Sequence, residues 1–359
     1  MSAQLFEPIV LRGLKVPHRL WVSPMCQYSA VDGVAQDWHL AHLGSFAIGR
    51  AGLIITEATA VNAIGRISPR DVGIWTDEQA QAWSRIAHFS HSQGVPMGIQ
   101  LAHAGRKAST ASPYEGRGPV HPDDGGWGAV APSALAFGSL PNPHQMTEGE
   151  IESVVEDFAS ASQRSVAAGF DAIEIHAAHG YLIHEFLSPL ANQRTDKYGG
   201  SFNNRVRFLL DIVRRVRSVI TDSYPLFVRI SATDWVEGGW TGDESVELSV
   251  MLEQLGVDLI DVSSAGLSGG QEIPVGPGYQ VPFARAIKQR VNVSVGTVGL
   301  VTAPSHAEAI VLERSADVVM VARQFLREPM FALRAAAELG GNLDWPQQYA
   351  MAKFPGSIP

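Results

Sequence analysis

Eight short apolar runs, rich in β-branched residues, recur along the 359 residues of the chain, and amphipathic stretches separate them. The runs are too short to be buried helices, and they hardly alternate with polar residues, which is typical of strands covered on both faces. The runs lie at 20–24, 52–57, 97–101, 171–175, 226–230, 257–262, 293–296 and 317–321, and the amphipathic stretches at 38–50, 77–93, 147–168, 201–220, 242–255, 282–291 and 303–314. This repeated strand–helix alternation predicts an α/β fold of the (β/α)8 TIM-barrel type.

A doubly wound parallel sheet is the alternative fold for such a pattern. No GxGxxG motif follows the first predicted strand, so the dinucleotide-binding fingerprint of that fold is missing. We therefore predict a single barrel domain over 1–359, a length that α/β barrels commonly reach. Two segments interrupt the alternation, a Pro- and Gly-rich excursion at 102–146 and an irregular tail at 339–359. Loops as long as the excursion are usually functional, and its aromatic residues predict an ordered hairpin or lid over the barrel mouth.

Composition excludes several classes of protein. With 27 Lys and Arg against 36 Asp and Glu, the formal net charge is −9, so the basic face of a nucleic-acid-binding protein is not expected. The single cysteine excludes an intrachain disulfide framework. No apolar run approaches the length of a membrane span, and residues 1–11 lack the pattern of a signal peptide. These features predict a cytoplasmic protein.

Polar side chains gather where the predicted strands end. The active sites of TIM barrels form at these carboxyl ends, so such residues are expected to converge on one ligand site. In chain order the strand ends carry Ser23, Pro24, Met25, Cys26 and Tyr28, then Glu57 and Ala58, Gln100 and His103, His176 and His179, Arg229, Ser263, Gly299 and Arg323.

His176 and His179 allow three interpretations from the residues alone. They could bind a metal ion together with His103, although the HExxH motif of zinc proteases is absent. They could instead be neutral donors to one substrate oxygen, or loop histidines satisfied by the backbone. For His39 and His42, which lie three residues apart in the first predicted helix, we expect packing against the barrel instead.

Two guanidinium groups suggest anion sites. Arg229 ends a buried strand, so it needs either a structural ion pair, for which Glu57 is a candidate partner, or a ligand. Barrels often bind phosphate between the loops after strands seven and eight. The segment 296–299 permits close backbone approach there, and Arg323 adds a cation. The glycines of that segment are equally compatible with a simple strand-to-helix turn.

Four motifs in order along the chain resemble the old yellow enzyme family. Cys26 together with Tyr28 is similar to the thermophilic-like subgroup of that family, and the resemblance runs from about Leu5 to about Tyr349. The motifs are Pro24-Met25-Cys26-Gln27-Tyr28, Gln100-Leu-Ala-His103-Ala-Gly-Arg106-Lys107, Glu174-Ile-His176-Ala-Ala-His179-Gly180-Tyr181-Leu182 and Asn192-Gln-Arg194-Thr-Asp196-Lys-Tyr198-Gly199-Gly200-Ser201.

The resemblance implies an FMN-dependent ene-reductase. Such an enzyme takes a hydride from NADPH or NADH and transfers it through flavin N5 to an alkene activated by a carbonyl or nitro group. Gln100 is then expected at the pyrimidine edge of the flavin and Arg229 beside N1 and O2. The other residues implied to bind the cofactor are Ser23, Pro24, Met25, Cys26 and Ala58 around the ring, and Gly299, Ala322 and Arg323 at the phosphate.

The same resemblance implies the substrate site. His176 and His179 would hold the carbonyl or nitro oxygen, Tyr181 would deliver a proton, and Tyr28 would contact the substrate. Tyr181 could also be a packed aromatic residue whose hydroxyl merely finds a partner. Ala322 departs from the family, which usually has glycine before the phosphate-binding arginine, and alanine suffices there unless that position needs a positive φ.

The tail departs from the family as well. The subgroup forms dimers in which a C-terminal arginine, shortly after a Gln-Tyr pair, reaches the neighbour's active site. This chain has Gln348-Tyr349 but no arginine after Arg334. Met351, Lys353 or Phe354 could take that place. We expect a homodimer or homotetramer that acts on small activated alkenes.

Two other functions remain open from the sequence. One is a metal-dependent hydrolase or lyase that uses His176, His179 and His103. The other is a barrel that has lost catalysis and only binds a ligand, since this fold supports many chemistries.

Overall fold

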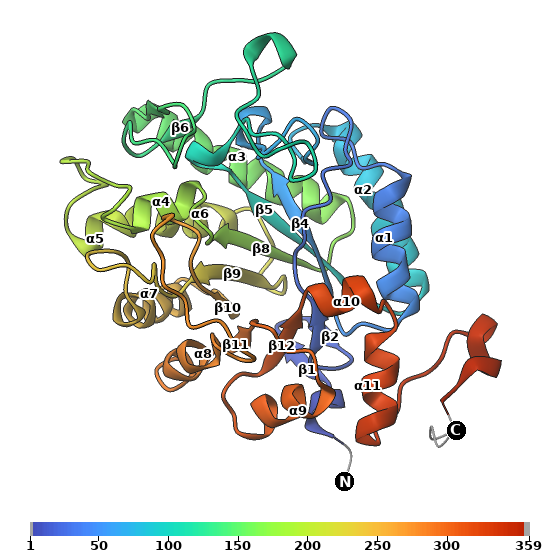
Figure 1. The fold of residues 1–359 in the computed structure, drawn as a ribbon. Helices are drawn as coiled ribbons and strands as arrows, with labels where there is room; N and C mark the ends of the chain where they lie inside the picture. The colour runs from blue at the N-terminus through green and yellow to red at the C-terminus, as the bar shows by residue number, and fades with distance from the viewer. Residues whose placement is uncertain (1–2, 355–359) are drawn as a thin grey trace.

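The computed structural model describes residues 3–354, and its centre is a closed barrel of eight parallel strands (Figure 1). The last strand pairs with the first, so the barrel has no free edge. In chain order the strands are β3 (Leu20–Val22), β4 (Ile54–Ala60), β5 (Met97–Ala102), β8 (Ala172–Ala177), β9 (Leu226–Ser231), β10 (Leu259–Ser263), β11 (Ser294–Thr297) and β12 (Val318–Val321). The prediction of a TIM barrel is confirmed, and each predicted strand overlaps one of these eight.

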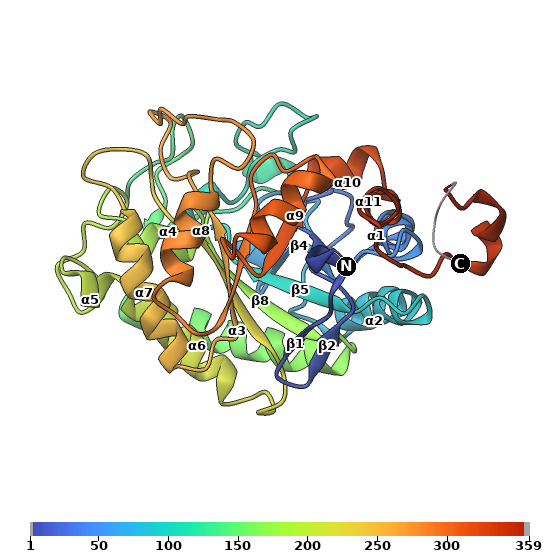
Figure 2. The ribbon, with the colours of Figure 1, turned by 90° about the horizontal axis from the view of Figure 1, so that it is seen from below.

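Helices follow the strands and surround the barrel (Figures 1 and 2). A capping box of Thr147 and Glu150 begins α3, as these two residues predict. The helix predicted at 201–220 is divided at Val206, and Ser201 occupies its N-cap position without a side-chain hydrogen bond. The helices are α1 (Asp37–Ile48), α2 (Asp77–Ser92), α3 (Glu148–Ala167), α4 (Leu182–Leu187), α5 (Phe202–Arg205), α6 (Arg207–Arg217), α7 (Gly242–Gln254), α8 (Val281–Lys288), α9 (Pro304–Leu312), α10 (Arg323–Arg327) and α11 (Phe331–Leu339).

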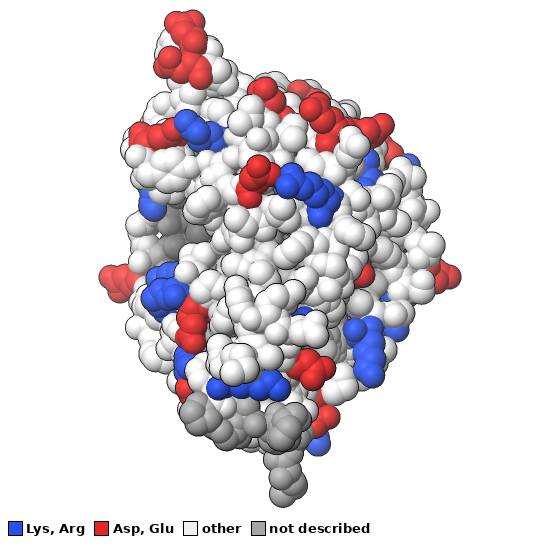
Figure 3. Space-filling model, turned by 90° about the vertical axis from the view of Figure 1, so that its right-hand side faces the viewer, with Lys and Arg blue, Asp and Glu red and all other residues white. Residues whose placement is uncertain are grey.

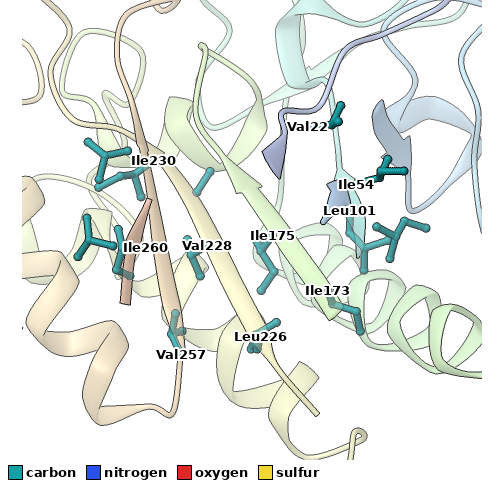
Figure 4. Packing of buried hydrophobic residues seen from close by; sticks show 14 of the residues in the cluster. Val22, Ile54, Leu101, Ile173, Ile175, Leu226, Val228, Ile230, Val257 and Ile260 are labelled. Atoms are coloured by element: carbon teal, nitrogen blue, oxygen red, sulfur yellow. The ribbon is translucent and has the colours of Figure 1, made fainter. Parts of the chain in front are cut away.

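Alternate residues of the strands face opposite sides of the barrel wall. Ile173 and Ile175 of β8, with Val228 and Ile230 of β9, belong to the hydrophobic layer between the barrel and the helices. Ile175 and Val228 are opposite each other in the pairing of the two strands and are neighbours in Figure 4. The residues that alternate with these four point into the barrel. The wall is buried on both sides, so a polar residue at an inward position must find its partners inside the barrel.

An N-terminal hairpin, which the strand pattern did not predict, packs against the inner apolar layer. Its strands β1 (Ile9–Leu11) and β2 (Leu14–Val16) are antiparallel and joined by Arg12-Gly13, a two-residue turn with φ +49° at Arg12. The apolar side chains of the hairpin cluster with Trp21, Phe227 and other inward residues near the strand starts. This packing leaves the opposite, carboxyl end of the barrel for a ligand.

The excursion lies between β5 and α3, and an isolated antiparallel bridge joins Thr110 to Pro119 within it. Its two short strands, β6 (Val130–Ala131) and β7 (His144–Gln145), are parallel because the chain loops back between them before pairing. Trp127 anchors it by donating from Nε1 to the carbonyl of Ile64 at 2.9 Å. The 3₁₀ turns of the described chain are η1 (Gln4–Phe6), η2 (Ala63–Gly65), η3 (Gly105–Lys107), η4 (Pro122–Asp124) and η5 (Gln347–Ala352), of which η3 and η4 belong to the excursion.

The C-terminal segment with η5 stands apart from the barrel in two perpendicular views (Figures 1 and 2). Tyr349 and Met351 are exposed there. On the face formed by α1, α2 and α11, acidic and basic side chains are interspersed around a broad uncharged area (Figure 3). No helix in the described part of the chain is long and apolar enough to cross a membrane.

Candidate active site

Four inward side chains form a buried polar layer across the barrel. Gln100 donates from Nε2 to Oε1 of Glu174 at 2.8 Å, and Arg229 Nε lies 3.1 Å from Oδ2 of Asp261. Arg229 also donates from Nη1 to the hydroxyl of Ser23 at 2.9 Å. Strand register brings these residues together, since Gln100 is opposite Glu174 and Arg229 is opposite Asp261.

Charge in this layer is close to balanced. Burial raises the pKa of Glu174 to about 8 and also raises that of Asp261, while Arg229 opposes both shifts. Two adjacent carboxyl groups that resist ionisation retain a proton near neutral pH. Arg229 then offsets the single remaining negative charge and leaves part of its guanidinium edge toward the barrel mouth.

The prediction that Glu57 could pair with Arg229 is wrong. A register shift between Ile55 and Ala58 interrupts the pairing of β4 with β5, and β4 continues to Ala60. Within this bulge Glu57 lies toward α1, where Oε1 is 3.4 Å from His39 Nε2 and Oε2 accepts from the Gln27 backbone N–H at 2.8 Å. His39 itself is a buried packing residue, as predicted.

The structure brings His176, His179 and Tyr181 together above the polar layer. The His176 ring centroid is 5.1 Å from that of His179 and 5.2 Å from that of Tyr181, both in edge-on geometry. His179 Nε2 lies 2.7 Å from the hydroxyl of Ser263, within hydrogen-bond distance. His176 Nδ1 is buried and has no hydrogen-bond partner in residues 3–354, so it is free for a ligand.

Protonation states suit this cluster to hydrogen-bond donation. Burial lowers the pKa of both His176 and His179 well below that of an ordinary histidine, so both rings are neutral. Burial also raises the pKa of Tyr181, which keeps its hydroxyl protonated. Among residues 3–354, no three His, Cys, Asp or Glu side chains are grouped so that they could hold a metal ion.

Lys107, for which the sequence predicted no role, connects the loop that carries His179 to the loop after β10. Its Nζ donates to the carbonyl of His179 at 2.8 Å and to that of Gly266. His179 has φ +59°, and a Cβ at Gly180 would approach the Gly266 carbonyl oxygen to 2.2 Å. The turn after β8 is therefore held tightly against the loop after β10. No local pattern indicates a contact over 72 residues.

A second unpredicted contact supports the same turn. His184 Nδ1 accepts from the Gly180 N–H at 2.9 Å, and its Nε2 lies 2.9 Å from Oδ1 of Asp234. Both His184 and Asp234 are fully buried. A histidine fixed in this way orients the backbone next to His179.

The loop after β3 carries Cys26 and Tyr28 to the barrel mouth. Tyr28 has φ +51°, a strained conformation for a tyrosine, and its carbonyl accepts from the hydroxyl of Tyr114. Burial, with the nearby Asp71 and Glu57, raises the pKa of the Cys26 thiol well above its ordinary value. The sulfur is therefore a neutral thiol and a poor nucleophile.

Loops after the last two strands enclose a cavity of about 220 Å³ whose lining includes Gly299, Ala322 and Arg323. Gly299 has φ +136°, and a Cβ there would lie 3.2 Å from Gln280 Nε2. Ala322 has φ −104°, so alanine is tolerated where the family usually has glycine. Ser23 and Arg229 also line this cavity, which joins it to the polar layer.

Asp71 gives the site region a testable pH dependence. Burial raises its pKa from 3.8 to about 7, and Oδ2 accepts from the Ile67 N–H at 2.7 Å. Between pH 4 and 7 the native state keeps a proton that the unfolded state releases, so this group lowers stability as pH rises through that window. Asp71→Asn keeps a hydrogen-bond acceptor and cannot ionise. Between pH 4.5 and 7.5 its free energy of unfolding should therefore rise relative to that of wild type by a few kcal/mol, at about 1.4 kcal/mol per pKa unit.

Urea unfolding at several pH values measures this difference. Asp123→Asn, on the exposed turn η4, is the control and should show no such trend. Parallel curves of stability against pH for wild type and Asp71→Asn would contradict the assignment.

Residues 4–342 match the sequence family of NADH:flavin oxidoreductases and NADH oxidases. The chain belongs to this family. An NADPH dehydrogenase of Halalkalibacterium halodurans is 44% identical over 98% of this chain and 99% of its own. Morphinone reductase in complex with tetrahydroNAD has a TM-score of 0.79 at 28% identity, over 98% of this chain and 94% of that one. An old yellow enzyme homologue from Zymomonas mobilis has a TM-score of 0.79 at 25% identity, over 99% and 97%.

The resemblance to the old yellow enzyme family is thus confirmed. The protein is an oxidoreductase of the FMN type, and the predictions of FMN and of a nicotinamide hydride donor are confirmed with it. A hydrolase or lyase on the same barrel is not favoured by these relatives.

The residues present fit FMN. The cavity beside Gly299 and Arg323 has the backbone approach and the cation that a phosphate needs. Arg229 lines the same cavity, and the amide of Gln100 belongs to the polar layer that contains Arg229, where a flavin ring needs polar partners. His176 Nδ1 has no hydrogen-bond partner among the described residues. Of the residues predicted to bind the cofactor, those that line this one cavity are Ser23, Pro24, Arg229, Gly299, Ala322 and Arg323.

Proposed function

We propose that this member of the old yellow enzyme family is an ene-reductase, which uses NADPH or NADH to reduce C=C bonds activated by a carbonyl or nitro group. When bound, FMN would supply the hydride chemistry that connects the nicotinamide to the β-carbon of the alkene through N5, in a ping-pong sequence. The observation that carries the proposal is the buried pair of neutral imidazoles, His176 and His179, beside Tyr181.

The chain's own residues have two tasks toward the cofactor. Gln100 would meet the donors and acceptors of the pyrimidine edge with its amide, and Arg229 would face N1 and O2, where negative charge accumulates on reduction. Gly299, Ala322 and Arg323 would bind the phosphate. The residues proposed to line the ring are Ser23, Pro24, Met25, Cys26 and Ala58.

Toward the substrate, the two histidines would donate N–H groups to the carbonyl or nitro oxygen. These donors stabilise the enolate-like charge that develops as hydride arrives at the β-carbon. The hydroxyl of Tyr181 would give its proton to the α-carbon, and Tyr28 would contact the substrate from the opposite side. Because the thiol of Cys26 is neutral, its proposed role is to modulate the flavin potential from the N5 edge.

A product assay tests the proposal. Under nitrogen, the holoenzyme should oxidise NADPH and form cyclohexanone from 2-cyclohexenone in a one-to-one ratio. The ene-reductase proposal would be overturned if NADPH reduced the bound flavin but no activated alkene gave a reduced product. A colourless protein carrying stoichiometric zinc would instead support a metal-dependent hydrolase.

We also propose that the protein is a homodimer or homotetramer whose C-terminal tail borders the partner's site. The support is the exposure of two large apolar side chains of the tail, Tyr349 and Met351. Trp345 and Phe354, with ring centroids 5.5 Å apart, give the tail an ordered base. An apolar tail of this kind gains stability when a second copy covers it.

Deletion of the residues after Gln347 tests the shared site. The truncated protein should stay folded and yellow, because residues 347–353 are exposed and carry little of the barrel's packing. Its KM for bulky enones should rise several-fold, while its KM for 2-cyclohexenone changes little. Equal KM values in both proteins across small and large enones would contradict the shared-site proposal.

A further inference from the structure

A second cavity, of about 460 Å³, opens at the barrel mouth beside the proposed substrate site. Tyr28, Ile67 and Tyr181 form one part of its wall, and residues of the excursion form the rest. Its lining contains two cations, Lys107 and Arg117, and no carboxylate. The apolar part of the wall comprises Ile67, Ala111, Pro113, Phe137 and Leu140.

Arg117 is held over this cavity by a tight loop. The Ala111 N–H donates to the Gly118 carbonyl at 2.8 Å, and Arg117 itself has φ +60°. The hydroxyl of Tyr114, on the same loop, donates to the carbonyl of Tyr28, which fastens the loop to the proposed substrate site. These contacts and the strained conformation fix the backbone that carries Arg117 at the mouth.

The guanidinium of Arg117 is exposed, and no carboxylate in residues 3–354 pairs with it. The nearest acid along the loop, Glu115, is already occupied, since Oε1 lies 2.9 Å from Arg70 Nε and Oε2 accepts from the Ser112 hydroxyl at 2.7 Å. The negative charge that would neutralise Arg117 is thus engaged elsewhere.

Lys107 adds a second positive charge deeper in the cavity. Its ammonium group donates to two backbone carbonyls and lies 4.1 Å from the centroid of Phe137, but no carboxylate in the described chain forms an ion pair with it. Burial lowers its pKa to about 8, so it remains mostly charged at neutral pH. Two cations with no acid between them, next to a small apolar wall, are a site for an anion.

We propose that Arg117, with Lys107 behind it, forms an anion-recognition subsite at the entrance to the active site. The ligand group is a carboxylate or phosphate on a molecule that reaches the flavin, and the inference rests on the ene-reductase proposal. Two sources have this chemistry, an activated alkene with a second, charged carboxylate, and the phosphates of the nicotinamide dinucleotide. The apolar wall fits the carbon skeleton of the former.

The test compares Arg117→Gln with Arg290→Gln in the holoenzyme. Arg290 lies just after α8, on the side of the barrel where the strands begin, so its change removes the same charge far from the mouth. The probes are 3-oxocyclohex-1-ene-1-carboxylate and its methyl ester, titrated against the oxidised flavin's absorbance. This binding measurement requires no turnover and therefore does not depend on whether the protein reduces alkenes.

Arg117→Gln should weaken binding of the acid roughly tenfold and that of the ester less than twofold, as expected for one charge-assisted contact. If Arg117→Gln instead lowered only the affinity for NADPH, by tenfold in the flavin-reduction assay, the anion would be a phosphate of the dinucleotide. That result would also support the subsite. Arg117→Glu should enlarge whichever effect is seen. The anion-subsite proposal would be overturned if Arg117→Gln weakened binding of the acid and the ester equally and left reduction by NADPH unchanged. It would also be overturned if Arg290→Gln caused the same losses of affinity.

Discussion

Alanine in place of His176 or His179 is expected to slow reoxidation of the reduced flavin by an enone about 10²–10³-fold, the usual cost of one lost oxyanion donor. The two rings are neutral and their centroids are 5.1 Å apart, and under the proposed function each would donate one N–H to the same substrate oxygen. Neither ring belongs to the polar layer or to the phosphate cavity, and bound FMN should persist. Anaerobic stopped-flow absorbance after reduction by NADPH measures the rate.

His88→Ala is the matched control, since His88 is exposed on α2. It should leave both half-reactions at their wild-type rates. Reduction by NADPH in the His176 and His179 variants should also slow less than reoxidation, because it develops no oxyanion on a substrate. Wild-type reoxidation rates in both variants would rule out the donor role.

Methionine in place of Arg229 should lower the free energy of unfolding by about 3–5 kcal/mol, the cost of breaking a buried ion pair from one side. Asp261 and Glu174 would lose the cation that offsets their charge, in a layer that solvent does not reach. The loss should be larger at pH 8 than at pH 6, because at the lower pH the two carboxyl groups can take up protons. Urea unfolding of the holoenzyme measures it.

Two further variants isolate the cause. Arg215→Met removes an exposed pair, with Arg215 Nε 2.8 Å from Glu156 Oε1, and should cost no more than about 1 kcal/mol. The double variant Arg229→Met with Asp261→Asn should recover part of the stability of the single variant, because the unpaired charge is gone. This balance of charges would be contradicted if Arg215→Met and Arg229→Met lowered the free energy of unfolding by similar amounts. It would also be contradicted if the double variant were no more stable than Arg229→Met.

The barrel could be predicted because its strands are buried on both faces, which makes them short, continuous apolar runs. The capping box at Thr147 likewise fixes the start of α3. The elements that were not predicted are short. Helices α4 and α10 have too few residues to show helical periodicity, and the hairpin of β1 and β2 depends on packing against side chains such as Phe227, more than 200 residues away in the sequence.

At the site, the strand ends could be predicted, but the pairing inside the barrel could not. Glu57 and Arg229 both follow buried runs, yet a bulge in β4 turns Glu57 away, and sequence alone gives no sign of that bulge. Asp261 and Glu174 carried an unused signal, since a carboxylate flanked by apolar residues inside a buried strand must face a buried partner. Lys107 reaches His179 through a backbone carbonyl, a contact that residue type does not encode.

A sequential stopped-flow experiment on the holoenzyme tests most directly the claim that one flavin site serves NADPH and an alkene in turn. Under anaerobic conditions the enzyme is first mixed with one equivalent of NADPH and then with 2-cyclohexenone. If one site serves both molecules, the flavin absorbance should bleach fully before any enone is present. It should return when the enone is added, with one equivalent of cyclohexanone formed. The claim would be contradicted if the flavin stayed reduced after the enone was added, or if it bleached only when enone was already present.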